Sequence, residues 1–477
     1  MSVTTPPSGN TVSEEERTEL GQQIRGTVLL PGEDGYDEAR EIWNTMIDRH
    51  PAIIVRPLGT ADVMAAVNFA RKHELELAIK GGGHNVAGNA VCDQGLMLDL
   101  SQMKSVHVDP DEKTARVEPG AILHDFDVEA QAHGLATPAG FVSTTGVAGL
   151  TLGGGIGYLS RKHGLTVDNL RSIDIVTANG EFVQASENEH PELFWALRGG
   201  GGNFGVVTSF EFELHELGPT VLAGPVVWSF DDAPTVLRKV ASFIRNAPDE
   251  VACLPVLRHA PPAPFLPEDV HGEMVLVVAM IYAGSLDEGE AALAPLRSIN
   301  SPIADAVDPK PYVAFQSMFD ATSGPGARNY WKSHYLADLD GDAIDTLCEY
   351  ASRMTSPESA IGMLSLGGAV ARTPPDATAY PHRDAMWVLN IQSRWHDTEN
   401  EDRHVQWTRD LFDAMTPYST GGVYVNFISR DENHDRVRAA YGADFYDRLA
   451  TVKSEWDPEN VFHLNQNIKP STAPKGS

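Results

Sequence analysis

A glycine turn that ends in a histidine is the first segment whose residue types suggest chemistry. Residues Lys80–Asn85 read Lys-Gly-Gly-Gly-His-Asn. Three consecutive glycines leave the turn without side chains, so its backbone can adopt positive φ angles and lie directly against a ligand. His84 stands at the tip of the turn and is therefore expected close to whatever the turn holds. The alternative is an ordinary tight turn with a solvated histidine.

A second segment of the same character follows about sixty residues later. Thr144–Gly157 alternates glycines with small apolar residues and contains the run Gly153-Gly154-Gly155. Taken singly, either glycine cluster could be no more than a tight turn. Together they suggest a long ligand that lies between two walls of bare backbone.

A tyrosine and an asparagine near the C-terminal end are candidates for acid-base chemistry. Tyr424 and Asn426 lie two residues apart on a predicted strand, so both side chains should point to one face. A phenol with a pKa near 10 needs a cation or another close contact before it can act as a base. The alternative for Tyr424 is a tyrosine packed at a domain seam.

Two further rows of polar side chains follow the same period of two. The rows are Tyr330, Lys332 and His334 on the predicted strand Arg328–Leu336, and Asn390, Gln392 and Arg394 on the predicted strand Ala385–Trp395. Alternation places each row on one face of its strand. Either row could line a substrate cavity or form a solvated sheet face.

The elements that must position these residues are short and mixed. The predicted strands are Leu77–Lys80, Leu170–Thr177 and Val206–Leu214, and the predicted helices are Glu38–Ile47, Leu123–His133 and His190–Arg198. Asn179-Gly180 is a hairpin signal after the second of these strands. Intermixed strands and helices predict an α+β fold rather than repeated βαβ units.

One glycine motif is misleading. Residues Gly200–Gly205 match the dinucleotide pattern G-x-G-x-x-G, which requires a strand before it and a helix after it. The predicted order here is the reverse, a helix and then a strand. The match is therefore not a Rossmann signal.

The character of the chain changes near Pro219. Strand-like segments such as Met274–Tyr282 alternate with helical ones such as Ala233–Arg245 and Ile344–Met354, which predicts an antiparallel sheet covered on one side by helices. We therefore expect four parts. They are a flexible tail (1–20), a first domain (21–218), a second domain (219–418) and a C-terminal segment (419–477).

Composition limits the classes of protein and partner. The chain has 477 residues and a net charge of -30, which argues against nucleic acid or an anionic membrane as a partner. Three distant cysteines form neither a zinc pattern nor a disulfide framework, and no apolar run approaches the roughly 20 residues that span a bilayer. With no secretory signal at the N-terminus, we expect a cytoplasmic protein of a salt-adapted organism.

The motifs, taken in order, resemble one family. They are Gly81-Gly-Gly-His84-Asn85, Thr144–Gly157 followed by Tyr158, Trp195–Val207, Tyr424-Val-Asn426-Phe, and Phe462-His-Leu-Asn465-Gln-Asn467. This set is similar to the FAD-linked oxidoreductases related to berberine bridge enzyme and 6-hydroxy-D-nicotine oxidase. That family has the vanillyl-alcohol-oxidase fold with a PCMH-type FAD-binding domain. The resemblance implies that the first and last parts bind FAD and that the middle part covers the flavin ring as a substrate domain.

The resemblance also implies the cofactor residues. His84 matches a histidine that is bonded covalently to FAD, whereas Val142 stands where many relatives carry a second tether on cysteine, so a single link through His84 is expected. Leu150 replaces a polar residue of many relatives, and Thr145 matches the position that controls oxygen access. The expected FAD contacts are Lys80, Gly81, Gly82, Gly83, His84, Asn85, Gly88, Thr144, Thr145, Gly146, Gly149, Gly153, Gly154, Gly157, Asn203, Gly205, Val207, Asn465 and Asn467.

The implied reaction is hydride transfer from an alcohol, a sugar or secondary hydroxyl, to FAD, which O2 or another acceptor reoxidises. An alcohol releases hydride readily only as its proton leaves, so a base is needed; Tyr424 matches the family's candidate base. Tyr330, Lys332 and Asn426 are the further catalytic candidates. Oxidation of a C–N bond and a flavin-binding protein without turnover are the alternatives, and a monomer or a dimer is expected.

Overall fold

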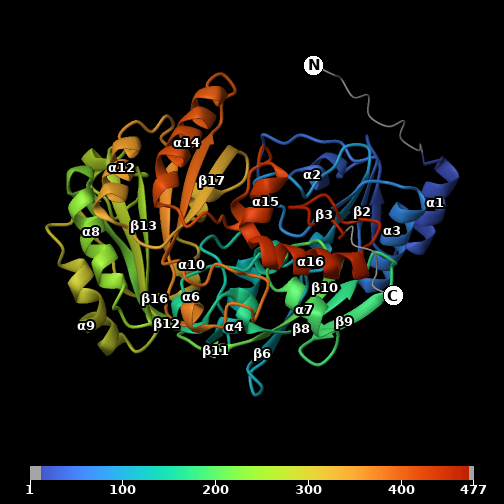
Figure 1. Cartoon of the computed structure of the whole chain (residues 1–477), viewed down its shortest axis with the longest axis horizontal. Coiled ribbons are helices and arrows are strands. Elements are labelled where there is room, and N and C mark those ends of the chain that lie inside the picture. Colours follow the sequence, from blue (N-terminus) through green and yellow to red (C-terminus); the bar gives the residue numbers. More distant parts are fainter. Residues whose placement is uncertain (1–11, 472–477) are drawn as a thin grey trace.

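The computed structural model describes residues 12–471. Its first sheet is formed by residues 27–99 and lies among the helices α1 (Glu14–Gln23), α2 (Tyr36–Arg40) and α3 (Thr60–Lys72) (Figure 1). The sheet contains β1 (Thr27–Leu29), β2 (Ile53–Arg56), β3 (Leu77–Lys80) and β4 (Leu96–Asp99) in the order β1-β2-β4-β3. β4 pairs in parallel with β2 and β3, and it is apolar and buried as a central parallel strand should be. The glycine turn therefore starts where β3 ends.

A second sheet follows it along the chain. Its strands are β5 (Val106–Asp109), β6 (Thr114–Val117), β8 (Leu170–Val176), β9 (Phe182–Ser186) and β10 (Val206–Glu213), in the order β5-β6-β10-β8-β9. β8 and β9 form the predicted hairpin, with Gly180 at a φ of 71° in its turn. A two-stranded ribbon of β7 (Leu135–Ala136) and β11 (His215–Glu216) completes this part.

The third sheet is the largest. It contains β12 (Thr220–Ser229), β13 (Val251–His259), β14 (Met274–Tyr282), β15 (Ala304–Asp305), β16 (Asp308–Pro311), β17 (Arg328–Leu336), β18 (Ala360–Ser365) and β19 (Trp387–Trp395). The order is β15-β12-β14-β13-β18-β19-β17, with β16 beside β12, and the pairings are antiparallel. This confirms the predicted antiparallel sheet and the α+β class.

The helices form two groups, one around the first two sheets and one mostly around the large sheet. Around the first two sheets lie α1, α2, α3, α4 (Leu123–Gln131), α5 (Val147–Leu152), α7 (Pro191–Leu197), α15 (His434–Tyr441) and α16 (Ala443–Trp456). The short helix α6 (Ser160–His163) contacts β13 of the large sheet. The remaining helices are α8 (Ala233–Ile244), α9 (Leu286–Arg297), α10 (Tyr312–Gln316), α11 (Asp320–Ser323), α12 (Gly341–Ala351), α13 (Ala369–Arg372) and α14 (Glu401–Met415). None of the helices in the described part of the chain is long and apolar enough to cross a bilayer.

The two faces of the large sheet have different neighbours. Helices α8, α9, α12 and α14 cover its outer face (Figure 1), where Trp228, Trp387 and Leu389 are buried against them. The opposite face packs on the region that contains the first two sheets, and Val388 and Leu364 belong to the core shared with that region. Because side chains alternate along a strand, a shift of one residue decides which face a side chain occupies.

The C-terminal segment returns to the first part of the chain. The buried Lys453 Nζ donates hydrogen bonds to the carbonyl oxygens of Asn203 and Phe462 and to Asp457. Asn465 Nδ2 donates to the carbonyl of Gly202. These bonds fix the last residues of the described chain against the glycine run that precedes β10.

Three local predictions were wrong. Residues 14–20 of the predicted tail are helical, because Ser13 and Glu16 form a capping box and Leu20 is buried; residues 1–11 lie outside the described part. The predicted helix Glu38–Ile47 ends at Arg40. Tyr424 precedes a 3₁₀ turn, residues 425–427, rather than lying on a strand.

Candidate active site

The two glycine segments are in direct backbone contact. A Cβ atom added to Gly82 would lie 2.5 Å from the N and Cα atoms of Gly146. The second segment is held in turn by α4 and the residues before it, since Leu123 N donates to Thr145 O and Val147 N donates to Ala121 O, both at 2.9 Å. The glycines are therefore needed for the contact between the segments as well as for their turns.

Two cavities that share lining residues run past these segments. The first has a volume of about 270 Å³ and the second of about 170 Å³. The residues that line both are Ile79, Gly81, Asn85, Ala90, Gly149 and Asn426. The first cavity lies between the glycine segments and the large sheet, and the second extends toward Gly202 and Phe462. Together they form one elongated site.

Most of the predicted site residues lie on these cavities. The first is lined by Gly81, Gly82, Gly83, His84, Asn85, Thr145, Gly146, Gly149, Tyr424 and Asn426, and the second by Asn203, Gly205, Val207 and Asn465. Lys80, Gly88, Thr144, Gly153, Gly154, Gly157 and Asn467 do not line either cavity.

The residues outside the cavities support their walls. Lys80 Nζ donates to the carbonyl oxygens of Ala39 and Glu41, which ties the loop after α2 to the end of β3. At Gly154, whose φ is 125°, an added Cβ atom would lie 2.8 Å from the Tyr380 ring. These positions shape the site although they do not line either cavity.

His84 is buried against an aromatic ring. Its imidazole stacks on the indole of Trp43 with 4.4 Å between ring centroids and 20° between planes, and Trp43 Nε1 donates to the carbonyl of Ser323 at 2.7 Å. His84 Nε2 is buried without a hydrogen-bond partner among the described residues. Burial lowers the pKa of His84 to about 4, so the ring is neutral near pH 7.

Tyr424 and Asn426 meet on the first cavity although they are not on a strand. Gly155 N donates to the Tyr424 hydroxyl oxygen at 3.0 Å, and Asn426 Nδ2 donates to the same oxygen at 2.9 Å. Asn426 Nδ2 also donates to the carbonyl of Leu150 at 3.2 Å. The predicted pairing of the two side chains is present, but the 3₁₀ turn creates it rather than strand alternation.

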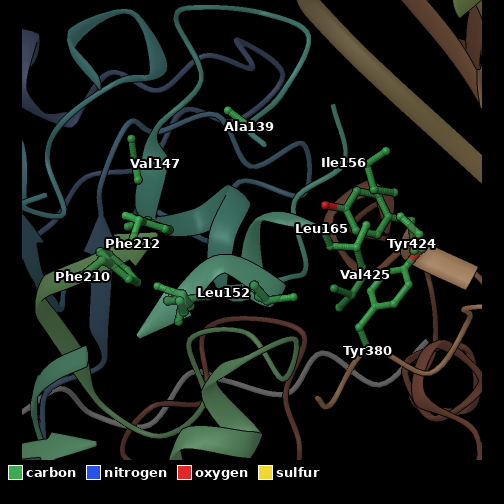
Figure 2. Close-up of a cluster of buried hydrophobic side chains, with 14 of the residues drawn as sticks. Ala139, Val147, Leu152, Ile156, Leu165, Phe210, Phe212, Tyr380, Tyr424 and Val425 are labelled. Carbon is green, nitrogen blue, oxygen red and sulfur yellow. The ribbon is translucent and has the colours of Figure 1, made fainter. Parts of the chain in front are cut away.

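Tyr424 lies at the edge of the core that surrounds the second glycine segment. Figure 2 shows its ring together with Tyr380, Leu165 and Ile156, which belong to the same buried cluster. Burial raises the pKa of Tyr424 to about 12, while the two donated hydrogen bonds act in the opposite direction. The hydroxyl is thus rigidly placed, and its oxygen accepts two bonds that also suit a phenolate.

The large sheet supplies the opposite wall, and its register corrects part of the prediction. Tyr330 and Lys332 point to the outer face, where Tyr330 donates to Asp431 and Lys332 pairs with Glu432. Neither lines the cavities. The alternate residues Asn329 and Trp331 face the first cavity instead. The sequence showed two faces of this strand, but only tertiary packing decides which is inside.

The other polar row does line the first cavity. Asn390, Gln392 and Arg394 are all on its wall, and Gln392 lies in register with Ala360 on β18 and with Trp331 on β17. Arg258 on β13 extends the same cross-strand row beyond Ala360. Four strands therefore contribute one row of side chains to the site.

Sequence reasoning missed several residues of this wall. Trp43, Arg258, Glu358 and Trp331 line the first cavity. Trp43 comes from the loop after α2, far from the sheet in sequence, and no local pattern links it to His84. The strand that carries Arg258 is mostly apolar. A single charged residue in such a strand was the one signal in the sequence that this position faces a polar site.

Comparison with known proteins agrees with this geometry. Residues 51–186 match the FAD binding domain family and residues 423–469 match the berberine and berberine-like family. An (R)-6-hydroxynicotine oxidase of Paenarthrobacter nicotinovorans is 33% identical, and the match covers 94% of this chain and 97% of that protein. The chain belongs to the berberine bridge enzyme-like FAD-linked oxidoreductases.

Other members of the family are similar along the whole chain. An FAD-linked oxidoreductase of Dictyostelium discoideum is 32% identical, with 95% of this chain and 96% of that protein covered. The crystal structure of 6-hydroxy-D-nicotine oxidase from Arthrobacter nicotinovorans superposes with a TM-score of 0.84 at 30% identity, covering 94% of this chain and 98% of that one. The fold and the family are thus shown over nearly the full length.

The cavities fit the FAD that this family binds. A Cβ atom added to Gly149 would meet no atom within 4 Å apart from its chain neighbours and the backbone of its own helix, although Gly149 lines both cavities. The buried Nε2 of His84 and Oδ1 of Asn465 have no hydrogen-bond partner among the described residues, and buried polar atoms are normally paired. Open backbone and unpaired polar atoms on one elongated site are what a dinucleotide needs.

Proposed function

We propose that this member of the family oxidises the CH–OH group of an alcohol, using FAD attached through His84. When bound, FAD accepts hydride from the substrate and passes the electrons to O2 or another acceptor. The observation that carries the proposal is the Tyr424 hydroxyl, which lies on the first cavity and accepts two hydrogen bonds.

Tyr424 is the proposed base. An alcohol carbon donates hydride more easily as its O–H proton leaves, so a proton acceptor must lie within hydrogen-bond reach. The N–H groups of Gly155 and Asn426 both point at the phenol oxygen and stabilise the negative charge that forms there after proton loss. Asn426 is a positioning residue, because its amide is held between Leu150 and Tyr424.

A single link through His84 is part of the proposal. A neutral imidazole has a free ring nitrogen to form the bond, and burial keeps this imidazole neutral. Val142 lines the first cavity, and none of the three cysteines lies on its wall. A second tether through sulfur has no residue to form it there.

Oxidation of a C–N bond is the second candidate. It is favoured by the 33% identity with an (R)-6-hydroxynicotine oxidase. The two candidates differ in the donor, because an amine needs to reach the flavin as the free base whereas an alcohol needs a base to remove its proton.

Anaerobic bleaching of the flavin separates the candidates. We expect secondary alcohols or sugars, but not amines, to bleach it. Tyr424→Phe should slow bleaching by about 100-fold or more, since the loss of a general base typically removes 10²–10⁴ in rate. Because the pKa of Tyr424 is raised to about 12, the wild-type rate should keep rising from about pH 7 to about pH 10.

Several outcomes contradict the proposal. Bleaching by amines alone would favour the C–N reaction, and an unchanged rate in Tyr424→Phe would remove Tyr424 as the base. A protein that stays yellow with every donor would instead be a flavin carrier without turnover.

A further inference from the structure

Two buried arginines lie on the sheet wall of the first cavity. Arg258 on β13 and Arg394 on β19 are each 8% exposed and both line the cavity. Their side chains come from neighbouring cross-strand rows, since Arg258 is in line with Gln392 and Arg394 is two residues further along β19. Burying a guanidinium is unfavourable unless an anion compensates its charge.

The protein compensates Arg258 only with neutral groups. Its Nε donates to the carbonyl of His259 at 3.3 Å and its Nη1 donates to Thr322 Oγ1 at 3.1 Å. Among residues 12–471 no carboxylate forms an ion pair with it. Burial accordingly lowers the pKa of Arg258 to about 10, although the group stays charged near pH 7.

Arg394 is also incompletely paired. Its Nη2 donates to the carbonyl of Gly324 at 2.7 Å, and its Nε lies 3.3 Å from Glu358 Oε2. Its Nη1 is buried without a hydrogen-bond partner in the described chain. The guanidinium lies 5.8 Å from the Trp43 ring centroid, on the side of the cavity that carries His84.

Glu358 is the one carboxylate among the described residues that line the first cavity, and of the two arginines it pairs with Arg394 alone. Glu358 lines the cavity with its side chain 43% exposed, and its Oε1 also lies 3.1 Å from the exposed His396. The two guanidinium groups and the one carboxylate that line the cavity together carry a charge of +1. This is the opposite sign to the net charge of the chain, -30.

Neutral polar and aromatic groups surround the arginines. Asn390 Oδ1 is buried without a donor in the described chain, and Gln392, Trp43 and Trp331 line the same cavity. Small residues in the middle of the wall leave room for a ligand. Amide groups and aromatic faces suit a polar, hydrogen-bonding molecule, while the arginines suit a negative end.

We propose that the substrate carries a carboxylate, which the guanidinium groups of Arg258 and Arg394 bind while the oxidised carbon lies near Tyr424. The position of the oxidised carbon near Tyr424 rests on the proposed function, whereas the binding of a carboxylate by the two arginines does not. A single carboxylate neutralises the local charge of +1, whereas a phosphate dianion would leave excess negative charge beside Glu358. The guanidinium fork also matches the two oxygens of a carboxylate.

Equilibrium binding to the oxidised holoenzyme tests the proposal without turnover. Calorimetry would compare two pairs of probes that carry no hydroxyl group, benzoate with benzamide and cyclohexanecarboxylate with cyclohexanecarboxamide. In at least one pair we expect the carboxylate to bind about tenfold or more tightly than its neutral partner, and Arg258→Gln and Arg394→Gln each to remove that preference. Glu358→Gln, at the more exposed position, should strengthen carboxylate binding several-fold.

The opposite effects of the arginine and glutamate variants distinguish charge recognition from a structural defect. Arg409→Gln is the matched control, because Arg409 contacts Tyr330 and Asp431 on the outer face of the sheet; it should leave the preference unchanged. Equal affinity within both pairs, or an unchanged preference in both arginine variants, overturns the anion site even if a donor bleaches the flavin. Tight carboxylate binding without bleaching by any donor overturns the proposed oxidation instead and supports the anion site.

Discussion

The two walls of the first cavity are built in different ways. The loop wall, formed by the glycine turn at 81–85 and the second glycine segment, presents backbone, and its few side chains include His84. The sheet wall, formed by β13, β17, β18 and β19, presents alternate side chains from four strands. The difference separates two tasks, because backbone can approach a large flat ligand closely, whereas side chains discriminate between small ones.

The largest expected effect tests the role of the loop wall in holding the cofactor. Acid-precipitated wild-type protein should stay yellow, because a covalent bond survives denaturation. His84→Ala should release all of its flavin into the supernatant, as measured by absorbance of the two fractions. Free flavin from the wild-type protein would refute the tether.

The next prediction tests a buried contact between α4 and α10 that lines neither cavity. Asp127 on α4 is buried, and Gln316 Nε2 on α10 donates to its Oδ2 at 3.2 Å. Burial raises the pKa of Asp127 to about 7. The folded protein therefore binds more protons than the unfolded chain from about pH 4 to about pH 7, so stability from this group falls as pH rises through that window.

Asp127→Asn should remove this pH dependence. The variant should match the wild type below about pH 4 and exceed it by roughly 3–4 kcal/mol above about pH 7, because one unit of pKa corresponds to about 1.4 kcal/mol. The measurement is Tm of both proteins at several pH values. A gap in Tm that stays constant or narrows toward alkaline pH contradicts the prediction.

A pair of glycine variants separates contact between segments from contact with FAD. Gly82→Ala places a methyl group 2.5 Å from Gly146 backbone and should destabilise the fold by about 1–3 kcal/mol. The methyl group of Gly149→Ala has no neighbour within 4 Å beyond the adjacent residues and the backbone of its own helix, so this variant should leave stability nearly unchanged but reduce FAD loading.

Gly82→Ala and Gly149→Ala are compared in a protein that also carries His84→Ala, because flavin can be removed from that protein. Tm without FAD should fall only for Gly82→Ala, and the FAD content after reconstitution should fall for Gly149→Ala. If Gly149→Ala loads FAD as fully as its parent, the cofactor does not pass that part of the loop wall.

The smallest effect belongs to the sheet wall. Ala360 lies between Arg258 and Gln392 in the cross-strand row. Ala360→Leu should narrow the cavity and raise KM by about tenfold for the best donor, since a methylene group in a pocket is worth about 1–3 kcal/mol. Retained flavin should not change, and Ala294→Leu on the exposed side of α9 is the control.

If Ala360→Leu loses flavin but keeps its KM, the assignment of the cofactor to the loop wall and of the substrate to the sheet wall is reversed. The sheet wall would then contact the cofactor rather than the substrate.

The cytoplasmic location and the salt adaptation expected from the sequence stay predictions, as do the domain boundaries at 219 and 418.

The burial of α1 against α3 shows one way in which composition misleads, since the polar start of the chain was expected to be a tail to residue 20. Its helix is stabilised by a cap and by one buried leucine, which a hydropathy pattern weighs too little.

The sequence alone determined the loop wall. Its glycines and His84 stand in two continuous segments of the sequence, and a backbone that must bend or approach a ligand leaves a local signature of missing side chains. Period-two alternation also gave the strand β17 with its bounds, and it separated Tyr330 and Lys332 from Asn329 and Trp331.

Tertiary structure alone decided which of those faces lines the cavity. Both faces of β17 are buried, one under α14 and one against the FAD-binding region. The alternation of residue types in the sequence therefore does not show which face lines the cavity. The same holds for Trp43 beside His84 and for Arg258 beside Arg394, which meet only because distant strands and loops pack together. A strand pattern specifies alternation, but the partner that covers each face is set by the packing of the whole chain.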